Sequence, residues 1–191
     1  MPFCCAVLDK LMYWVQSVLR DSDLLYSPDQ VEQALARMAR SITATLGEAN
    51  PLILVVMIGG LIPAGRLVTR LPFPLELDYV HVTRYRRGTT GGDLQWRVRP
   101  TSSIRDRVVL LIDDILDEGI TLGAIMNWCE QEGAQAVYSA VLVEKQHDRK
   151  PILQHADFSG LQVEDRYVFG CGMDYKGYLR NIPGIHAVKG L

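Results

Sequence analysis

The hydrophobic positions of this chain recur with two periods, one typical of helices and the other of strands. Apolar residues spaced three and four apart predict helices over residues 8–19, 28–46 and 62–71, and another from residue 122 to near Gly133. Continuous or alternating apolar runs predict strands over residues 52–57, 77–85, 94–98, 108–112 and 136–143, with short ones over 167–170 and 185–188. Because strands and helices alternate, the sequence predicts an α/β fold with a mainly parallel sheet.

The helix over residues 28–46 has the clearest boundaries. Ser27 is a good N-cap, Pro28 suits the first helical position, and Gln30 completes a capping box with Ser27. Gly47 stands just beyond the last apolar position and marks the end of the helix.

The composition favours one globular domain over residues 1–191. With 48% hydrophobic and 22% charged residues, a chain of this length buries a sufficient core without metals or cross-links. The net charge of −2 gives no general attraction to nucleic acid or to an anionic membrane. The N-terminus lacks the pattern of a secretory signal, and no uncharged run approaches the roughly 20 residues that cross a bilayer.

The cysteines indicate a reducing compartment. The four cysteines, at positions 4, 5, 129 and 171, lack the spacing of a metal site. Adjacent Cys4 and Cys5 are poor partners for a structural disulfide framework. We therefore expect free thiols in a cytoplasmic protein.

The segment over residues 108–121 carries the most chemistry. Its apolar strand is followed by acids and a glycine turn: Asp113, Asp114, Asp117, Gly119 and Thr121. Carboxylates can hold hydroxyl groups or a hydrated cation, and main-chain N–H groups at a helix N-terminus can hold a phosphate. A ribose 5-phosphate would satisfy both sites, and ligands collect beyond the carboxyl ends of parallel strands. The alternative is an ordinary strand-to-helix turn in which Asp and Gly act only as caps.

This order of strand, acid pair, third acid and Gly-x-Thr resembles the signature of the type I phosphoribosyltransferases. Further segments resemble the hypoxanthine-guanine phosphoribosyltransferases within that group. The resemblance runs from the second helix to the C-terminus and is strongest over residues 57–60, 112–121, 142–145 and 167–174, with Arg180 shortly after. It implies the type I phosphoribosyltransferase fold, a mainly parallel central sheet flanked by helices, with a small hood built from N- and C-terminal segments.

The resemblance also implies a role for each acid. Asp113 and Asp114 match the pair that holds the ribose hydroxyls, directly or through Mg²⁺. Asp117 matches the catalytic acid beside the purine imidazole ring, where it handles the proton lost as the N-glycosidic bond forms. Asp174 matches an acid near a second Mg²⁺ and the pyrophosphate. Mg²⁺ is thus the implied cofactor, with Asp113, Asp114 and Asp174 as its ligands.

The implied phosphate loop departs from the family at two positions. It comprises Asp117, Glu118, Gly119, Ile120 and Thr121, whose main-chain N–H groups would wrap the 5-phosphate while the Thr121 hydroxyl adds a donor. Glu118 stands where a small hydroxyl residue is common, and Ile120 where lysine or glycine is common. Because a carboxylate repels a phosphate, we predict that the Glu118 side chain points outward.

The pyrophosphate site is implied to comprise Ile58, Gly59, Gly60 and Arg180. Glycine permits a close approach of the main chain. The family often holds a cis peptide here, which implies one between Met57 and Ile58. A basic residue is frequent at the position of Ile58, so pyrophosphate would rely on Mg²⁺, main-chain N–H groups and Arg180.

The implied purine contacts are Ile115, Lys145, Tyr167, Val168 and Asp174. The ammonium group of Lys145 only donates hydrogen bonds, so it favours a 6-oxopurine over adenine. Tyr167 matches the aromatic residue that stacks on the base, and Val168 the residue whose main chain meets the purine edge. Residues 84–92 match a loop that closes over the reaction, although a simple exposed hairpin fits this stretch as well.

The resemblance therefore implies a purine salvage enzyme, a glycosyltransferase that moves the phosphoribosyl group of phosphoribosyl pyrophosphate onto hypoxanthine or guanine. A homodimer or homotetramer is the implied assembly, and the first helix, with Trp14, would form a subunit contact or cover the core.

A xanthine-preferring enzyme is one alternative, because residues 59–64 look similar to that group too. A non-catalytic nucleic-acid-binding regulator is another, since five arginines fall between Arg84 and Arg99. Acidic residues balance these arginines over the whole chain, which argues against nucleic-acid binding. The presence of Asp117 and Lys145 favours catalysis over a regulatory role.

Overall fold

The computed structural model describes residues 3–84, 94–149 and 152–190 of the chain. Within these ranges the helices are α1 (Phe3–Asp21), α2 (Pro28–Leu46), α3 (Leu61–Val68) and α4 (Ile120–Gln131). The strands are β1 (Asp23–Tyr26), β2 (Leu52–Met57), β3 (Glu76–Arg84), β4 (Leu94–Val98), β5 (Val108–Leu116), β6 (Ala136–Gln146), β7 (Phe158–Glu164), β8 (Val168–Phe169) and β9 (Ile185–Ala187). This order confirms the predicted α/β class.

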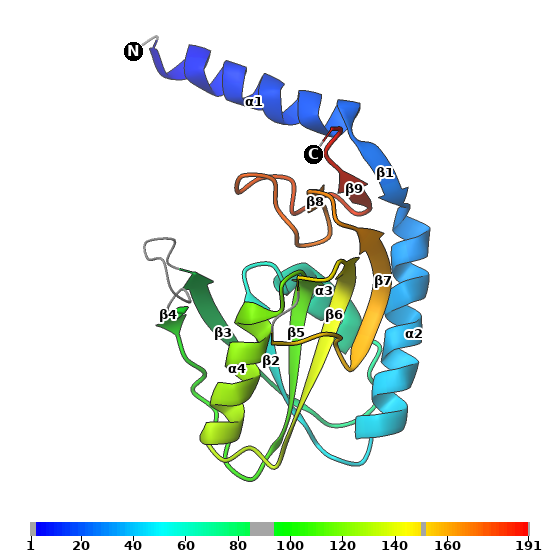
Figure 1. The fold of residues 1–191 in the computed structure, drawn as a ribbon, viewed down its shortest axis with the longest axis vertical. Coiled ribbons are helices and arrows are strands. Elements are labelled where there is room, and N and C mark those ends of the chain that lie inside the picture. Colours follow the sequence, from blue (N-terminus) through cyan, green and yellow to red (C-terminus); the bar gives the residue numbers. More distant parts are fainter. Residues whose placement is uncertain (1–2, 85–93, 150–151, 191) are drawn as a thin grey trace.

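A six-stranded sheet forms the body of the molecule (Figure 1). Its order is β4-β3-β2-β5-β6-β7, and each neighbouring pair is parallel except β3 with the edge strand β4. Helices α2 and α3 pack on one face and α4 on the other. Strand β2 is buried on both faces, which explains why its sequence is continuously apolar rather than alternating.

Helix α2 forms as its sequence pattern predicts. The side chain of Ser27 accepts a hydrogen bond from the N–H of Gln30, and the side chain of Gln30 accepts one from the N–H of Ser27. The apolar positions of this helix, spaced three or four apart, are buried against the sheet. Gly47 follows directly after the last helical residue.

The predicted hood is a separate three-stranded sheet of order β1-β9-β8. Strand β1, near the N-terminus, pairs antiparallel with β9, near the C-terminus. In Figure 1 this sheet lies beyond the carboxyl ends of the parallel strands, and α1 leads into it. The ring of Trp14 lies 5.4 Å from that of Tyr175, and Val15 and Val18 pack on the same hood cluster. The described side chains of α1 therefore cover a small core in the hood, one of the two roles left open by the sequence.

Several predicted boundaries are wrong. Helix α1 begins at Phe3 instead of Leu8, and β6 continues to Gln146 instead of ending at Val143, because β7 pairs with it as far as Gln146 with Glu164. Strand β5 continues to Leu116 instead of ending at Ile112, because β6 pairs with it as far as Leu116 with Glu144. The acid pair therefore lies inside a strand. Helix α3 ends at Val68 instead of Leu71, since the N–H groups of Arg70 and Leu71 bond to carbonyls three residues back and tighten the chain into a turn.

Strands β1 and β7 were not predicted. Strand β1 has only 4 residues, too few to establish a period. In β7, buried positions do not alternate regularly, because Gly160 interrupts the pattern. A Cβ atom at Gly160 would lie 2.8 Å from the sulfur of Met38 in α2, so the close packing of that helix explains the interruption.

Among the described residues, no helix is both long and apolar enough to span a bilayer.

Candidate active site

A cavity of about 540 Å³ lies where the carboxyl ends of the central strands face the hood. Most of the sequence-predicted site residues line it: Ile58, Gly59, Asp113, Asp114, Ile115, Asp117, Glu118, Gly119, Thr121, Lys145, Tyr167, Val168, Asp174 and Arg180. Two others, Gly60 and Ile120, are not among the lining residues. The cavity thus gathers segments that are far apart in the sequence.

The wall also contains apolar residues that sequence reasoning missed: Val56, Met57, Val82, Leu116, Leu122 and Met173. Each lies at a strand end, in the first turn of α4 or in the hood loop, the segment over residues 170–184 between β8 and β9. Their apolar character gave no usable signal, because a cavity wall and a packed core use the same residue types.

Strand β5 delivers the acid pair to the cavity. Asp114 is 8% exposed, and Asp113 Oδ1 accepts the main-chain N–H of Asp114 at 2.9 Å. Burial, together with the neighbouring Asp114 carboxylate, raises the pKa of Asp113 well above its usual value. Burial likewise raises the pKa of Asp114. Hydroxyl donors or a cation would relieve this electrostatic cost.

Arg180 joins the acid pair to the hood loop. Its Nη2 lies 2.6 Å from Asp174 Oδ1, and its Nη1 lies 3.8 Å from Asp114 Oδ2. Nη1 also donates to the carbonyl of Gly172. These contacts hold a fixed positive charge next to the acids, as an anion site requires.

Gly59 brings the main chain against the acid pair. A Cβ atom at this position would lie 2.1 Å from Asp114 Oδ2, so no larger residue fits without moving the carboxylate. A Cβ atom at Gly60 would lie 2.5 Å from the carbonyl oxygen of Ile112. The peptide bond between Met57 and Ile58 is cis, as the resemblance implied.

Replacement of Asp113 by asparagine is expected to stabilise the folded protein at neutral pH. Because the pKa of Asp113 is raised on folding, its ionisation opposes folding, and stability falls as the pH rises from near 3.8 through the folded-state pKa. Asparagine removes the charge and keeps the oxygen that accepts the Asp114 N–H. We expect a gain on the order of 1 kcal/mol at pH 7 that disappears near pH 3, measured by urea denaturation. An equal difference at both pH values would contradict this account.

The turn before α4 has the conformation that an anion site needs. Gly119 has φ of 74°, and a Cβ atom there would lie 2.6 Å from the carbonyl oxygen of Leu153. The first N–H groups of a helix lack intrahelical acceptors and can bind an anion, and Thr121 lines the cavity beside them. Glu118 lines the same cavity. That its side chain points away from a bound phosphate stays a prediction.

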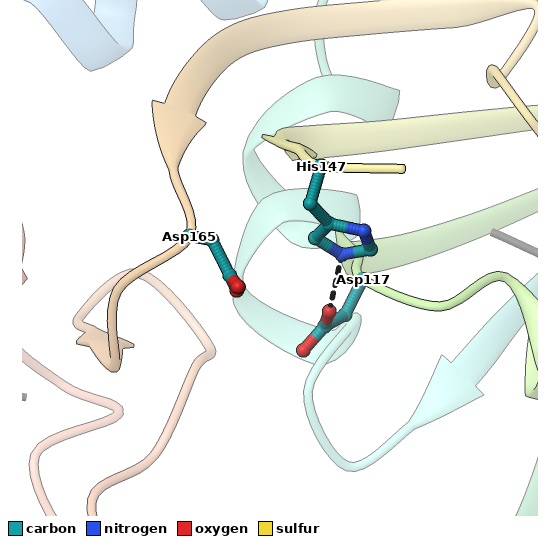
Figure 2. Close-up of side chains that lie close together, drawn as sticks. All are labelled: Asp117, His147 and Asp165. Atoms are coloured by element: carbon teal, nitrogen blue, oxygen red, sulfur yellow. Dashed lines mark hydrogen bonds and ion pairs between the residues drawn. The ribbon is translucent and has the colours of Figure 1, made fainter. Parts of the chain in front are cut away.

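Asp117 belongs to a network of hydrogen bonds and ion pairs. Its Oδ2 lies 3.0 Å from Lys145 Nζ, and its Oδ1 lies 2.8 Å from His147 Nε2 (Figure 2). Lys145 Nζ lies 3.6 Å from Asp165 Oδ1, and Asp165 Oδ2 lies 2.7 Å from Arg149 Nη1. Burial opposes the ionisation of Asp117, but hydrogen bonds from His147 and Lys145 outweigh it and hold the pKa of Asp117 below its usual value.

Three residues of this network have the spacing of metal ligands. One ligand atom from each of Asp117, His147 and Asp165 lies within 4.8 Å of the others. The ammonium group of Lys145, however, already contacts both carboxylates. The lysine therefore already neutralises these acids, and we interpret the cluster as an ion-pair network.

Sequence reasoning missed His147 and Asp165. Each is two residues from a predicted site residue, since His147 follows Lys145 and Asp165 precedes Tyr167. Because Lys145 lies at the end of β6, a polar residue two positions on was a usable signal for His147, whereas Asp165 and Tyr167 both lie between β7 and β8. The partnership with Asp117 depends on the folded loops and could not be predicted.

The predicted base contacts come from β5, from β6 and from the hood side of the cavity. Tyr167 is 41% exposed, and its ring meets the Tyr175 ring edge-on with centroids 5.3 Å apart. Val168 is buried in β8, and the Lys145 side chain is 12% exposed. Stacking of a base on Tyr167 stays a prediction. The predicted closing loop over residues 84–92 lies outside the described residues, except for Arg84 at the end of β3.

The chain matches the phosphoribosyl transferase domain family over residues 22–176, a range that begins after α1. The hypoxanthine-guanine-xanthine phosphoribosyltransferase of Tritrichomonas foetus is 28% identical over 87% of this chain and 91% of its own. The hypoxanthine-guanine phosphoribosyltransferase of Bacillus subtilis is 28% identical over 87% of this chain and 92% of its own. A crystal structure of a hypoxanthine phosphoribosyltransferase from Staphylococcus aureus is similar with a TM-score of 0.82 and 28% identity, over 89% of this chain and 93% of that one.

Proposed function

Because this chain belongs to the phosphoribosyl transferase domain family, we propose that it transfers the 5-phosphoribosyl group of phosphoribosyl pyrophosphate to hypoxanthine or guanine. The products are inosine or guanosine monophosphate and pyrophosphate, which makes this a purine salvage reaction. The observation that carries the proposal is a single cavity lined by the acid pair, Asp117, the glycine turn and Lys145. These are the groups that a sugar phosphate and a 6-oxopurine need.

The donor set of the acid pair fits Mg²⁺. Asp113, Asp114 and Asp174 offer only carboxylate oxygens, which this cation prefers. A cation would also offset the burial and repulsion that raise the pKa of Asp113. We assign the three acids to Mg²⁺ and the ribose hydroxyls. When bound, the ion supplies positive charge that stabilises the departing pyrophosphate.

The side chains around the base determine which purine is accepted. Lys145 Nζ is held at the cavity by Asp117 and Asp165 and can donate to a 6-oxo group. The 6-amino group of adenine cannot accept that hydrogen bond. Asp117, ionised because its pKa is lowered, takes up the proton that the purine imidazole ring loses. Tyr167 would cover the face of the base.

Xanthine is the second candidate substrate, favoured by the name of the Tritrichomonas foetus relative. Both oxopurine classes share the 6-oxo group that Lys145 would recognise, so this lysine does not separate them.

The proposed function is tested by measuring pyrophosphate release from phosphoribosyl pyrophosphate and Mg²⁺ with guanine, hypoxanthine, xanthine or adenine. We expect turnover of guanine and hypoxanthine, and kcat/KM for adenine at least about 100-fold lower. A higher kcat/KM for xanthine than for the other bases would move the assignment to xanthine. Absence of release with all four bases would overturn the proposal.

The same proposal includes one domain over residues 1–191 that forms a homodimer or homotetramer in the cytoplasm. Three apolar side chains, Leu61, Leu77 and Tyr79, are 51%, 57% and 43% exposed. Leu77 and Tyr79 pair with β2 residues that pack against α3, so they share the face of the sheet that carries this helix. Apolar side chains on one exposed face suit a contact between subunits. Cys129 and Cys171 are free thiols, which suits a reducing compartment.

A further inference from the structure

The imidazole ring of His147 lies almost fully buried against Asp117. Its side chain is 5% exposed, and Nε2 lies 2.8 Å from Oδ1 of Asp117. Nδ1 accepts the main-chain N–H of Arg149 at 3.1 Å. Because Nδ1 is an acceptor in this bond, the proton of the neutral ring is on Nε2. The ring therefore donates to the carboxylate in the hydrogen bond that Figure 2 draws between the two residues.

Each oxygen of the Asp117 carboxylate thus has its own donor. His147 contacts Oδ1, whereas Lys145 Nζ contacts Oδ2 at 3.0 Å. Arg149 supports both sides of this arrangement, since its main chain fixes the His147 ring and its guanidinium group lies 2.7 Å from Asp165. Asp165 in turn lies 3.6 Å from Lys145. The five residues, Asp117 included, are therefore linked in a closed ring of hydrogen bonds and ion pairs.

The two donors differ in whether they would also contact a bound base. Under the proposed function, Lys145 donates to the 6-oxo group of the purine, and its contact with Oδ2 of Asp117 is the one that the imidazole nitrogen of the purine must replace. His147 has no such second task, and its ring is held by Arg149. Oδ1 therefore stays occupied while Oδ2 becomes available to the imidazole nitrogen of the purine.

We propose that His147 is a positioning residue that fixes Oδ1 of Asp117 and leaves Oδ2 to exchange Lys145 for the purine. The inference rests on the proposed function and extends it. Metal binding by the same residues would need a lone pair on Nε2, which would move the ring proton to Nδ1 and set it against the N–H of Arg149. The hydrogen bonds therefore favour positioning over metal binding.

The test compares His147→Ala with His147→Gln in steady-state assays with guanine. The loss of one hydrogen bond to an ionised acceptor is expected to lower kcat about tenfold in H147A. Glutamine can still donate from its amide, so kcat in H147Q should stay within about threefold of the wild-type value. The acidic limb of the kcat/KM profile should move to higher pH in H147A alone, since Asp117 loses a donor that favours its ionised form. KM for phosphoribosyl pyrophosphate should not change.

Two further variants provide controls. His155 Nδ1 lies 2.7 Å from Oε1 of Glu144, and His155 is not among the residues that line the cavity, so H155A should retain wild-type kcat. In an Asp117→Asn background, H147A should lower kcat by less than about twofold, because the ring acts through Asp117.

The outcomes separate the inference from the function it rests on. A folded H147A variant with wild-type kcat and an unmoved acidic limb would overturn the inference, as would equal losses in H147A and H147Q. A wild-type protein inactive with every oxopurine would overturn the proposed function and the inference together. If H147A does not fold, ¹⁵N spectra of the wild-type imidazole decide: a proton on Nε2 is expected, and a proton on Nδ1 would refute the inference.

Discussion

Asp117→Asn is expected to lower kcat for guanine by about 10²–10³-fold, a loss in the range for removal of a general acid or base. The amide cannot accept the purine proton. It also offers one acceptor oxygen where the carboxylate offers two, so it can accept from His147 or from Lys145 but not from both in their present positions. KM for phosphoribosyl pyrophosphate should stay within about threefold, because the ribose acids lie on β5 and keep their contacts.

A matched surface variant isolates this effect. Asp148 is exposed and adjacent in sequence to His147, but it does not line the cavity, so Asp148→Asn removes the same charge without touching the site. We expect wild-type kcat for that variant. If D117N retains more than about a third of the wild-type kcat, Asp117 does not handle the purine proton, and another group must be sought.

Gly172→Ala is expected to destabilise the protein by about 3 kcal/mol. Gly172 has φ of 109°, and a Cβ atom there would lie 2.2 Å from the carbonyl oxygen of Gly59 and 3.1 Å from Cδ of Pro63. The nearest neighbour is main chain, so a side-chain rotation cannot remove the clash. The hood loop must therefore move away from Gly59, which should also raise KM for phosphoribosyl pyrophosphate.

Gly177→Ala separates backbone strain from the clash. Gly177 lies in the same loop with φ of 88°, but a Cβ atom there meets nothing within 4 Å. We expect a loss of about 1 kcal/mol in urea denaturation, from the unfavourable backbone conformation alone. Equal losses in G172A and G177A would show that the close approach to Gly59 does not limit stability.

The elements predicted best are those whose signals are local. Helix α2 carries its own cap and an apolar stripe, and β2 carries an uninterrupted apolar run, so each could be located without knowledge of its neighbours. Strand β5 was predicted too short because two adjacent acids interrupt its apolar run before the last two apolar residues, and pairing with β6 keeps all four in the strand. Strand β1 was missed because it is extended only through pairing with β9, at the other end of the chain.

In the candidate site too, residues with a local sequence signal were predicted, and those that depend on distant partners were not. The acids, the glycines and Lys145 were found because they match a motif in a fixed order along the chain. His147 belongs to no such motif, and its role depends on where the end of β6 lies relative to the loop after β5. The orientation of Glu118 depends on the side-chain interactions of one turn, which sequence patterns do not encode.

The pairing of β1 with β9 has a consequence for synthesis of the protein on the ribosome. Strand β1 is synthesised well before its only strand partner among the described residues, which begins at Ile185, so it stays unpaired while the segment between them is translated. A nascent chain that stops short of that point can assemble the large sheet yet cannot close the hood over the cavity. Closure of the hood over the cavity is thereby coupled to synthesis of β9, and fragments that end before Ile185 should not bind substrates productively.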